Sequence, residues 1–234
     1  YIFSTPFAHE FMKIKRRKFG VLDTRGPRFL YIFGPSQNGK STFLRFALKL
    51  LTGHHLQPFS GSDFSKRKIL NALSIGTVFP LVFDDLAPGQ KGSFEEVLKS
   101  FWEVWWSAES VSPQILMSSN VYNLKDWAKS RLKRIDFDVH FAPNEKHKEK
   151  LAEMFARENL IFRWFSYFYF QEIQTAQVSG DDELCVARLA MKKLYEFSDR
   201  SLPDYFPAQP IERLYDPGRR HWKDLLGHLK KARV

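Results

Sequence analysis

Cysteine is nearly absent from this sequence, which contains Cys185 alone among its 234 residues. A disulfide framework needs a pair of cysteines, so packing must hold the fold, and this cysteine usage is typical of a reducing, intracellular compartment. Glycine and proline are also few, at 12 residues each, whereas 44% of the residues are hydrophobic and 16% are aromatic. This composition excludes a disordered chain and predicts at least one sizeable packed core.

Long hydrophobic runs are missing as well. The most apolar stretch, LIFRWFSYFYF at 160–170, contains Arg163 and falls short of the roughly 20 apolar residues that cross a bilayer. We interpret it as a buried helix face and expect no membrane partner. The helix that carries Trp102, Trp105 and Trp106 is interpreted in the same way, because large aromatic side chains at helical spacing are most often core residues.

Acidic residues are outnumbered, with 26 Asp and Glu against 36 Lys and Arg, which gives a net charge of +10. The basic excess is concentrated in residues 1–26 and 212–234. Phosphates are the commonest dense array of negative charge that a protein meets, so this charge favours a nucleic-acid partner. The densest basic run, at 13–18, fits a solvated face or a linker equally well, so charge alone does not identify the partner.

Alternating strand and helix patterns predict an α/β fold. Apolar runs that stop at turn residues predict strands at 28–33, 77–83, 114–117 and 134–141. Helical spacing of apolar residues predicts helices at 39–51, 65–73 and 93–106, and again from 144 to 197. We therefore expect a mainly parallel sheet flanked by helices, followed by a helical C-terminal region.

The segment GPSQNGKS at 34–41 fits the phosphate-loop pattern G-x-x-x-x-G-K-[ST]. It lies between a predicted strand and a predicted helix, so the backbone N–H groups of the loop and the helix N-terminus converge on one anion. In this arrangement Lys40 reaches the β- and γ-phosphates of ATP, and the Ser41 hydroxyl ligates Mg²⁺. The residues expected to hold the nucleotide are Gly34, Pro35, Ser36, Gln37, Asn38, Gly39, Lys40, Ser41 and Thr42.

Two carboxylates end the second predicted strand, in the segment LVFDD at 81–85. Ligands of open α/β sheets bind at the carboxyl ends of the strands, where Asp84 and Asp85 fall. We expect Asp84 to hold the magnesium ion, directly or through water, and Asp85 to act as general base on the attacking water. The alternative is a pair of aspartates that cap the turn after the strand.

The third predicted strand also turns polar at its end, in the segment ILMSSN at 115–120. The carboxamide of Asn120 can hydrogen-bond both the γ-phosphate and the attacking water, although an asparagine that starts the next turn is the simpler alternative. Arg131 follows directly before the fourth predicted strand, where an ordinary surface arginine is the alternative.

Together these segments resemble the superfamily-3 helicases, the ATPases of viral and plasmid replication initiators within the AAA+ class. The resemblance spans roughly 28–141 and rests on GPSQNGKS, LVFDD and ILMSSN, while SRLKRIDF at 130–137 is similar to the stretch that carries the family's arginine finger. It implies that Arg131, or alternatively Arg134, reaches the ATP site of a neighbouring copy. It further implies a homo-oligomeric ring, usually a hexamer, that acts on DNA in the cytoplasm or, if viral, in the nucleus of a host cell.

One feature departs from that family. Its members carry a DNA-tracking hairpin between the second and third motifs, typically with a lysine and a histidine. The corresponding interval here contains no histidine, and Lys91 is the one good candidate for a contact with nucleic acid. A solvated loop lysine is at least an equal alternative, so the sequence supports ATP binding better than unwinding.

Composition shifts divide the chain into four expected segments. These are a basic lead-in or linker from an upstream domain at 1–26, a P-loop ATPase core at 27–143, a helical subdomain at 144–200, and a Pro-rich basic tail with a last helix at 201–234. The first residue is Tyr1 rather than methionine, and with the basic lead-in it predicts an upstream domain in the same polypeptide.

Three functions are compatible with these motifs. The first is a ring-forming ATPase that couples hydrolysis to translocation on, or unwinding of, nucleic acid as a module of a larger replication protein. The second is a regulatory ATPase whose nucleotide state controls oligomerisation or an attached effector without translocation. A P-loop kinase for a small molecule is the third, and it would leave Asn120 and Arg131 without a shared role.

Overall fold

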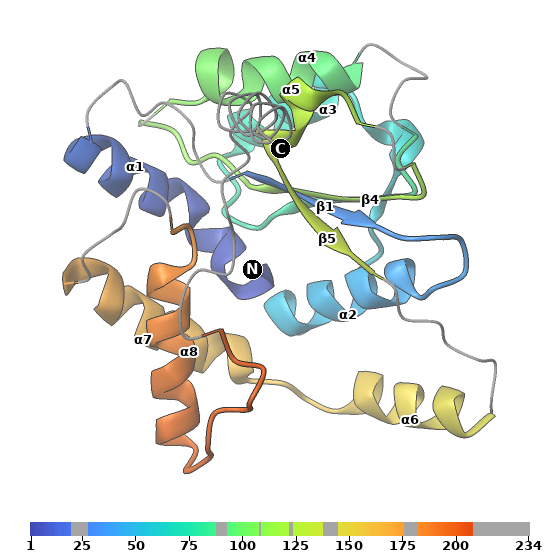
Figure 1. The fold of residues 1–234 in the computed structure, drawn as a ribbon, viewed down its shortest axis with the longest axis vertical. Helices are drawn as coiled ribbons and strands as arrows, with labels where there is room; N and C mark the ends of the chain where they lie inside the picture. The colour runs from blue at the N-terminus through green and yellow to red at the C-terminus, as the bar shows by residue number, and fades with distance from the viewer. Residues whose placement is uncertain are drawn as a thin grey trace, which may run out of the picture.

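The protein has an α/β core with a helical C-terminal part, shown in Figure 1. This computed structural model describes residues 1–19, 28–87, 93–107, 109–121, 124–137, 145–175 and 182–207. Within these ranges no helix is both long enough and apolar enough to cross a membrane.

Five parallel strands form a single sheet, which confirms the predicted fold class. The strands are β1 (Phe29–Phe33), β2 (Phe59–Ser60), β3 (Leu81–Asp84), β4 (Ile115–Ser119) and β5 (Leu132–Asp136). Their order in the sheet is β2-β3-β4-β1-β5, so β4 is inserted between β1 and β3 although it comes after both in the chain. The carboxyl ends of all five strands therefore meet at one edge.

Helices cover both faces of the sheet. Helix α2 (Lys40–Thr52) lies on one face, and α3 (Lys66–Ile75), α4 (Ser93–Ser100) and α5 (Asp126–Lys129) lie on the other (Figure 1). Alternate residues of each strand point to opposite faces, so Leu30 packs with Leu44 of α2, while Tyr31 packs in the cluster that contains Ile69 of α3. This two-sided burial explains why the strands are almost continuously apolar.

Three predicted strands have wrong boundaries, and the one expected at 114–117 runs two residues further, to Ser119. The strand expected at 77–83 begins at Leu81, because Pro80 lacks the N–H group that a central strand donates. The strand expected at 134–141 begins earlier, at Leu132, which pairs with Phe29 of β1. Residues 138–141 of that expected strand lie outside the described residues. The helix expected at 93–106 is formed by α4 and a π-helical turn, η3 (Phe101–Trp105).

Of the segment expected as a basic lead-in at 1–26, the described residues 1–19 fold onto the rest of the protein. A 3-10 helix, η1 (Ile2–Phe7), leads into α1 (Ala8–Phe19). Met12 packs in the core on the face of the sheet that α3 and α4 cover, whereas Phe11, its neighbour, packs in the core of the helical region. These residues therefore join the two parts, and an upstream domain stays a prediction. Of the expected tail at 201–234, residues 208–234, with the predicted last helix, lie outside the described residues.

The helical region consists of α6 (Glu145–Ala156), α7 (Ile161–Thr175) and α8 (Cys185–Phe197). Helix α7 packs on α8 through a cluster that includes Phe165, Phe168, Tyr169, Val186 and Ala190. The expected buried helix face is confirmed for one side of α7, where these three aromatic residues are buried and Phe162 packs partly buried against the same cluster. The other side of α7 carries Trp164, Tyr167 and Phe170, whose side chains are 41%, 54% and 63% exposed.

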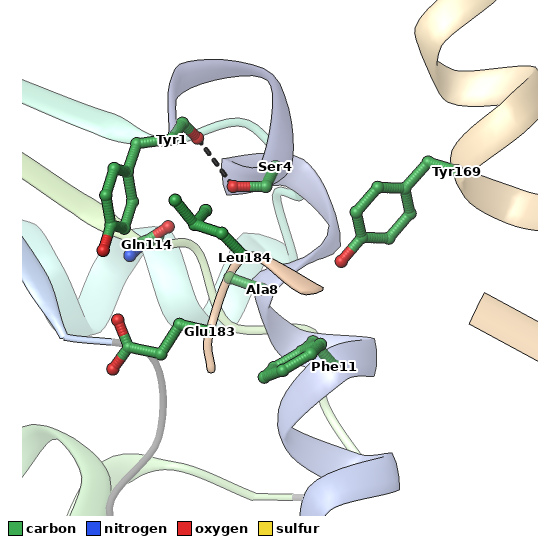
Figure 2. A pocket seen from close by; sticks show the side chains of 8 residues that line it. All are labelled: Tyr1, Ser4, Ala8, Phe11, Gln114, Tyr169, Glu183 and Leu184. Carbon is green, nitrogen blue, oxygen red and sulfur yellow. Dashed lines mark hydrogen bonds between the residues drawn. The ribbon is translucent and has the colours of Figure 1, made fainter. Parts of the chain in front are cut away.

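Charged residues connect the helical region to the sheet at the edge where the strands begin. Arg28, directly before β1, forms an ion pair with Glu183, two residues before α8, with Nε and Oε1 3.1 Å apart. Figure 2 shows Glu183 beside Tyr1 and Gln114 in a small pocket between η1, α1 and the loop that leads to α8. Lys133 of β5 lies 5.3 Å from the Tyr1 ring. Burial lowers the pKa of Lys133 to about 8. The charge of Arg28 also lowers this pKa, while the charge of Glu183 raises it.

This shift predicts a pH-dependent stability. The pKa of Lys133 is about 8 in the folded protein against 10.5 for an ordinary lysine, so between these values the unfolded chain binds more protons than the folded one. The contribution of Lys133 to the free energy of unfolding therefore rises with pH across this window. We expect Lys133→Met to be more stable than wild type at pH 7.5, and the difference to shrink as the pH approaches 10. Urea unfolding at several pH values measures it, with Lys150→Met, an exposed lysine of α6, as control. A difference that does not change with pH would contradict the prediction.

Candidate nucleotide site

The phosphate loop follows β1 and ends at the first residue of α2. Gly39 stands before the helix with φ 84°, and Gln37 has φ 64°, so both residues adopt the left-handed conformation. Such a backbone turns successive N–H groups toward a common point, and the N-terminus of α2 adds its partial positive charge there. The local structure therefore has the form that the sequence pattern predicts for an anion site.

Lys40, the lysine of the motif, is buried within its own loop. Its Nζ atom donates to the carbonyl oxygens of Gly34 and Pro35 at 2.7 and 2.6 Å. It also donates to Oδ1 of Asn38 at 3.1 Å and to Oδ1 of Asn120 at 2.7 Å. Burial lowers the pKa of Lys40, because it disfavours the charged form, while the nearby carboxylates of Asp84 and Asp85 oppose this effect.

A chain of hydrogen bonds joins three strand ends across the site. Nζ of Lys40, after β1, donates to the amide oxygen of Asn120, after β4. The amide nitrogen of Asn120 then donates to Oδ1 of Asp85, after β3, at 3.1 Å. Because the carboxamide has both a donor and an acceptor, Asn120 can bridge an ammonium and a carboxylate at once. Three residues predicted separately from the sequence are therefore in direct contact.

Asp85 itself has an uncommon backbone conformation, with φ 57°. Aspartate tolerates the left-handed region better than most residues, and the conformation turns its carboxylate out at the end of β3, where it is exposed. A Cβ atom at Gly61 would lie 2.3 Å from the carbonyl oxygen of Asp85, so only glycine allows this close approach of the two backbones. The position of Asp85 thus depends on a residue far from the motif.

Ser118 is a site residue that sequence reasoning missed. Its hydroxyl donates to Oδ1 of Asp84 and accepts from the backbone N–H of Asp85 at 3.0 Å. The neighbouring Ser119 donates to the carbonyl oxygen of Leu86 at 2.6 Å. Both serines are fully buried in β4, an otherwise apolar strand. Two buried hydroxyls in such a strand were the available signal, because buried polar groups require partners.

The donor set at this edge fits a magnesium ion. Ser41 lies in the first turn of α2, next to Lys40, and the carboxylate of Asp84 acts on that same lysine. Hydroxyl and carboxylate oxygens, completed by phosphate and water oxygens, are the ligands that Mg²⁺ prefers. Among the described residues, no three of His, Cys, Asp and Glu are grouped to hold a metal by themselves. Any magnesium here would therefore need further oxygen ligands, from phosphate or water.

Arg131 lies away from this site, whereas the guanidinium of Arg134 lies 4.7 Å from the ring of Phe33, the residue that precedes the phosphate loop. Arg131 stands directly before β5, and its backbone oxygen accepts from the N–H of Phe29, so it lies at the edge where the strands begin. A five-residue strand at about 3.3 Å per residue separates that edge from the phosphate loop by roughly 16 Å. The guanidinium of Arg131 donates to the carbonyl oxygen of Trp127 at 3.3 Å and lies 5.7 Å from the indole ring of the same tryptophan. Arg134 lies inside β5, paired with Asp136 at 2.6 Å.

The remaining predicted site residues differ in exposure, and one of them lies outside the described residues. Ser36 is exposed in the loop, as are Pro35 and Gln37, and Thr42 is partly buried in α2. Lys91, the candidate contact for nucleic acid, lies outside the described residues.

Comparison with known proteins gives matches among solved structures alone: no family model matches this chain, and no curated protein matches it in sequence. A structure titled "SCCmec type IV Cch - active helicase" has a TM-score of 0.45 and 14% identity, over 97% of this chain and 47% of that chain. An inhibitor-bound JCV helicase has a TM-score of 0.33 and 17% identity, over 85% of this chain and 57% of that chain. The chain thus spans about half the length of these helicases, and likenesses at this level carry no argument about activity.

The bonds of Ser118 predict a measurable loss of stability. Ser118→Ala removes a partner of Asp84 and leaves the N–H of Asp85 without its acceptor, so we expect the free energy of unfolding to fall by about 1–3 kcal/mol. Ser74→Ala, at an exposed serine of α3, is the control and should change it by less than about 0.5 kcal/mol. Equilibrium urea unfolding measures both. Equal stabilities of the two variants would show that the serine bridge contributes nothing.

Proposed function

We propose that this protein is a magnesium-dependent ATP hydrolase of the helicase type, active as a ring and coupled to nucleic acid. The observation that carries the proposal is the contact chain from Lys40 through Asn120 to Asp85. It joins a phosphate-binding lysine, an amide able to sense the γ-phosphate and a carboxylate able to activate water. These are the groups that hydrolysis of a phosphoanhydride needs in one place.

The chemistry divides among these residues. The loop amides and Lys40 bind the β- and γ-phosphates and stabilise the negative charge that develops as the terminal phosphoryl group leaves ADP. Magnesium, held by Ser41 and Asp84, would neutralise part of the phosphate charge. Asp85 accepts a proton from the attacking water, whose oxygen forms the new bond to the γ-phosphorus. Asn120 holds Asp85 and faces the phosphate end, so it can align the water with its target.

The position of Arg131 supports a ring. It lies at the edge of the sheet opposite the phosphate loop, so within one copy it cannot reach the phosphates. In a head-to-tail assembly, the edge where the strands begin in one copy faces the edge where they end in the next, and Arg131 then acts in trans. Such an arginine would stabilise the charge on the transferred phosphoryl group and make hydrolysis depend on assembly. Arg134 is a weaker candidate because Asp136 already neutralises its guanidinium.

Nucleic acid is the proposed partner, and DNA the preferred one. The net charge of +10 favours a polyanion, and α1 contributes Arg17 and Lys18 as exposed basic residues. We further propose that the chain is the motor module of a larger replication-type protein in the cytoplasm or in the nucleus of a host cell. The alternative remains an ATPase switch that assembles on nucleotide binding and controls an attached effector without translocation.

The first test measures the steady-state ATPase rate against protein concentration, with and without single-stranded DNA. We expect a rate that rises steeply with concentration and further with DNA, because each site needs a neighbour. Lys40→Ala should neither bind ATP tightly nor hydrolyse it, whereas Arg131→Ala should bind ATP but turn over at least about 10³-fold more slowly. Arg134→Ala is the matched control. Assembly driven by nucleotide without stimulation by DNA would favour the switch instead.

Mixing two inactive variants tests the action in trans directly. Lys40→Ala keeps its arginine and Arg131→Ala keeps its phosphate loop, so a mixed ring contains interfaces with both groups intact. At equal amounts, about a quarter of the interfaces combine them, and about a quarter of the wild-type rate should return. If the mixture hydrolyses no more ATP than the two variants separately, Arg131 does not act on a neighbour.

A further inference from the structure

Helix α6 is the least buried helix of the region that follows the sheet, since none of its residues is buried. In Figure 1 it lies beyond α2, on the side away from the sheet. Its position must therefore depend on a few specific contacts at its ends, because helices of about 12 residues are only marginally stable without packing. Among the described residues, the contacts at its C-terminal end come from α2.

The C-terminal end of α6 is attached to α2. Lys49 of α2 is buried, and its ammonium donates to the carbonyl oxygens of Phe155 and Arg157, the latter at 2.7 Å. The carbonyl groups at the end of a helix carry partial negative charge, so a buried cation is favourable there. The ring of Phe155 also packs edge-on against Phe46 of α2, with centroids 5.4 Å apart. Helix α6 is thus fixed to the same helix that begins at the phosphate loop.

The chain that leads to α6 is attached to the phosphate loop itself. Phe137, which follows β5, donates its N–H to the carbonyl oxygen of Phe33 at 2.7 Å. Its own carbonyl oxygen accepts from the amide nitrogen of Asn38, whose side chain is buried. The space for this contact exists because residue 34 is glycine: a Cβ there would lie 2.2 Å from Nδ2 of Asn38 and 2.6 Å from the carbonyl oxygen of Phe137.

The other end of the same carboxamide faces the ammonium of Lys40, at 3.1 Å. One buried side chain therefore connects the lysine that binds phosphate to the backbone at the exit of β5. The orientation of the carboxamide is determined by these two partners, because an ammonium can only donate and a carbonyl can only accept.

We propose that Asn38 is a positioning residue that couples occupancy of the phosphate loop to the end of β5 and, through it, to α6. This proposal rests on the proposed binding of ATP and adds a route by which the nucleotide affects the helical region. When phosphates occupy the loop, Lys40 turns to their oxygens and no longer donates a hydrogen bond to the amide oxygen of Asn38. The hydrogen bond from the carboxamide to the carbonyl oxygen of Phe137 then changes. The conformational equilibrium of the end of β5 shifts with it.

Hydrogen exchange followed by mass spectrometry tests the coupling, on the full chain with and without saturating MgADP. In wild type we expect MgADP to change deuterium uptake in peptides that cover 132–137 and 145–156. Asn38→Ala removes both bonds, and we expect it to bind MgADP within about tenfold of wild type, because the bond to Phe137 is neutral and Lys40 keeps its other acceptors. Its response at 132–137 and 145–156 should be lost. Ser74→Ala, at an exposed serine of α3 that lies outside the site, should respond as wild type does.

A second variant separates coupling from mere packing. Asn38→Asp keeps the shape of the side chain and its contact with Lys40, but a carboxylate cannot donate to the carbonyl oxygen of Phe137. We expect it to lose the exchange response as Asn38→Ala does, and to bind MgADP more weakly because of the added negative charge. A purely structural role would leave the Asn38→Asp response intact.

Three results would overturn the coupling. One is an unchanged exchange response in either Asn38 variant, and another is the lack of any response in a wild type that binds MgADP. The third needs no nucleotide: uptake at 132–137 should already be raised in Asn38→Ala alone, and equal uptake in the variant and wild type would reject the contact itself. A wild type that does not bind MgADP would instead reject the proposed function.

Discussion

The parallel sheet brings the carboxyl ends of its strands to one edge, and the whole candidate site depends on this constraint. The ammonium of Lys40 can meet Asn120, and Asn120 can meet Asp85, because β4 is inserted between β1 and β3. If β4 stood at either edge of the sheet, at least one of these contacts would span one or more additional strand spacings of about 4.8 Å. The strand order therefore turns three local motifs into one polar network.

The network has a second layer that holds its charged groups in place. Ser118 fixes Asp84 and the backbone of Asp85, and Gly61 allows the chain after β2 to approach Asp85 closely. The buried hydroxyl and amide groups form hydrogen bonds with other groups of the protein, and these bonds stabilise a single arrangement of the site. Hydrogen bonds also connect Lys40 to Asn38 and Asn38 to Phe137, so the phosphate loop is linked to the chain that follows β5.

Much of the fold was predictable because its signals are local. Apolar runs that end at glycine, proline or aspartate indicated the strands, and the phosphate-loop pattern indicated the turn between β1 and α2. Errors arose where long-range pairing decides. The start of β5 is set by Leu132 pairing with Phe29, and nothing in the sequence around 132 shows that partner. The outward side of α7, with Trp164 and Tyr167, is likewise set by which neighbours α7 has, not by its composition.

The sequence by itself determined the chemical groups of the candidate site: the lysine of the loop, the pair of aspartates and the asparagine at a strand end. These follow from patterns within a few residues, since a phosphate loop and a polar strand end are made by contiguous chain. Tertiary structure alone decided which of these groups touch, that Ser118 and Gly61 support them, and that Arg131 lies at the opposite edge. Those outcomes depend on strand order and on the approach of segments far apart in the chain, which local patterns do not encode.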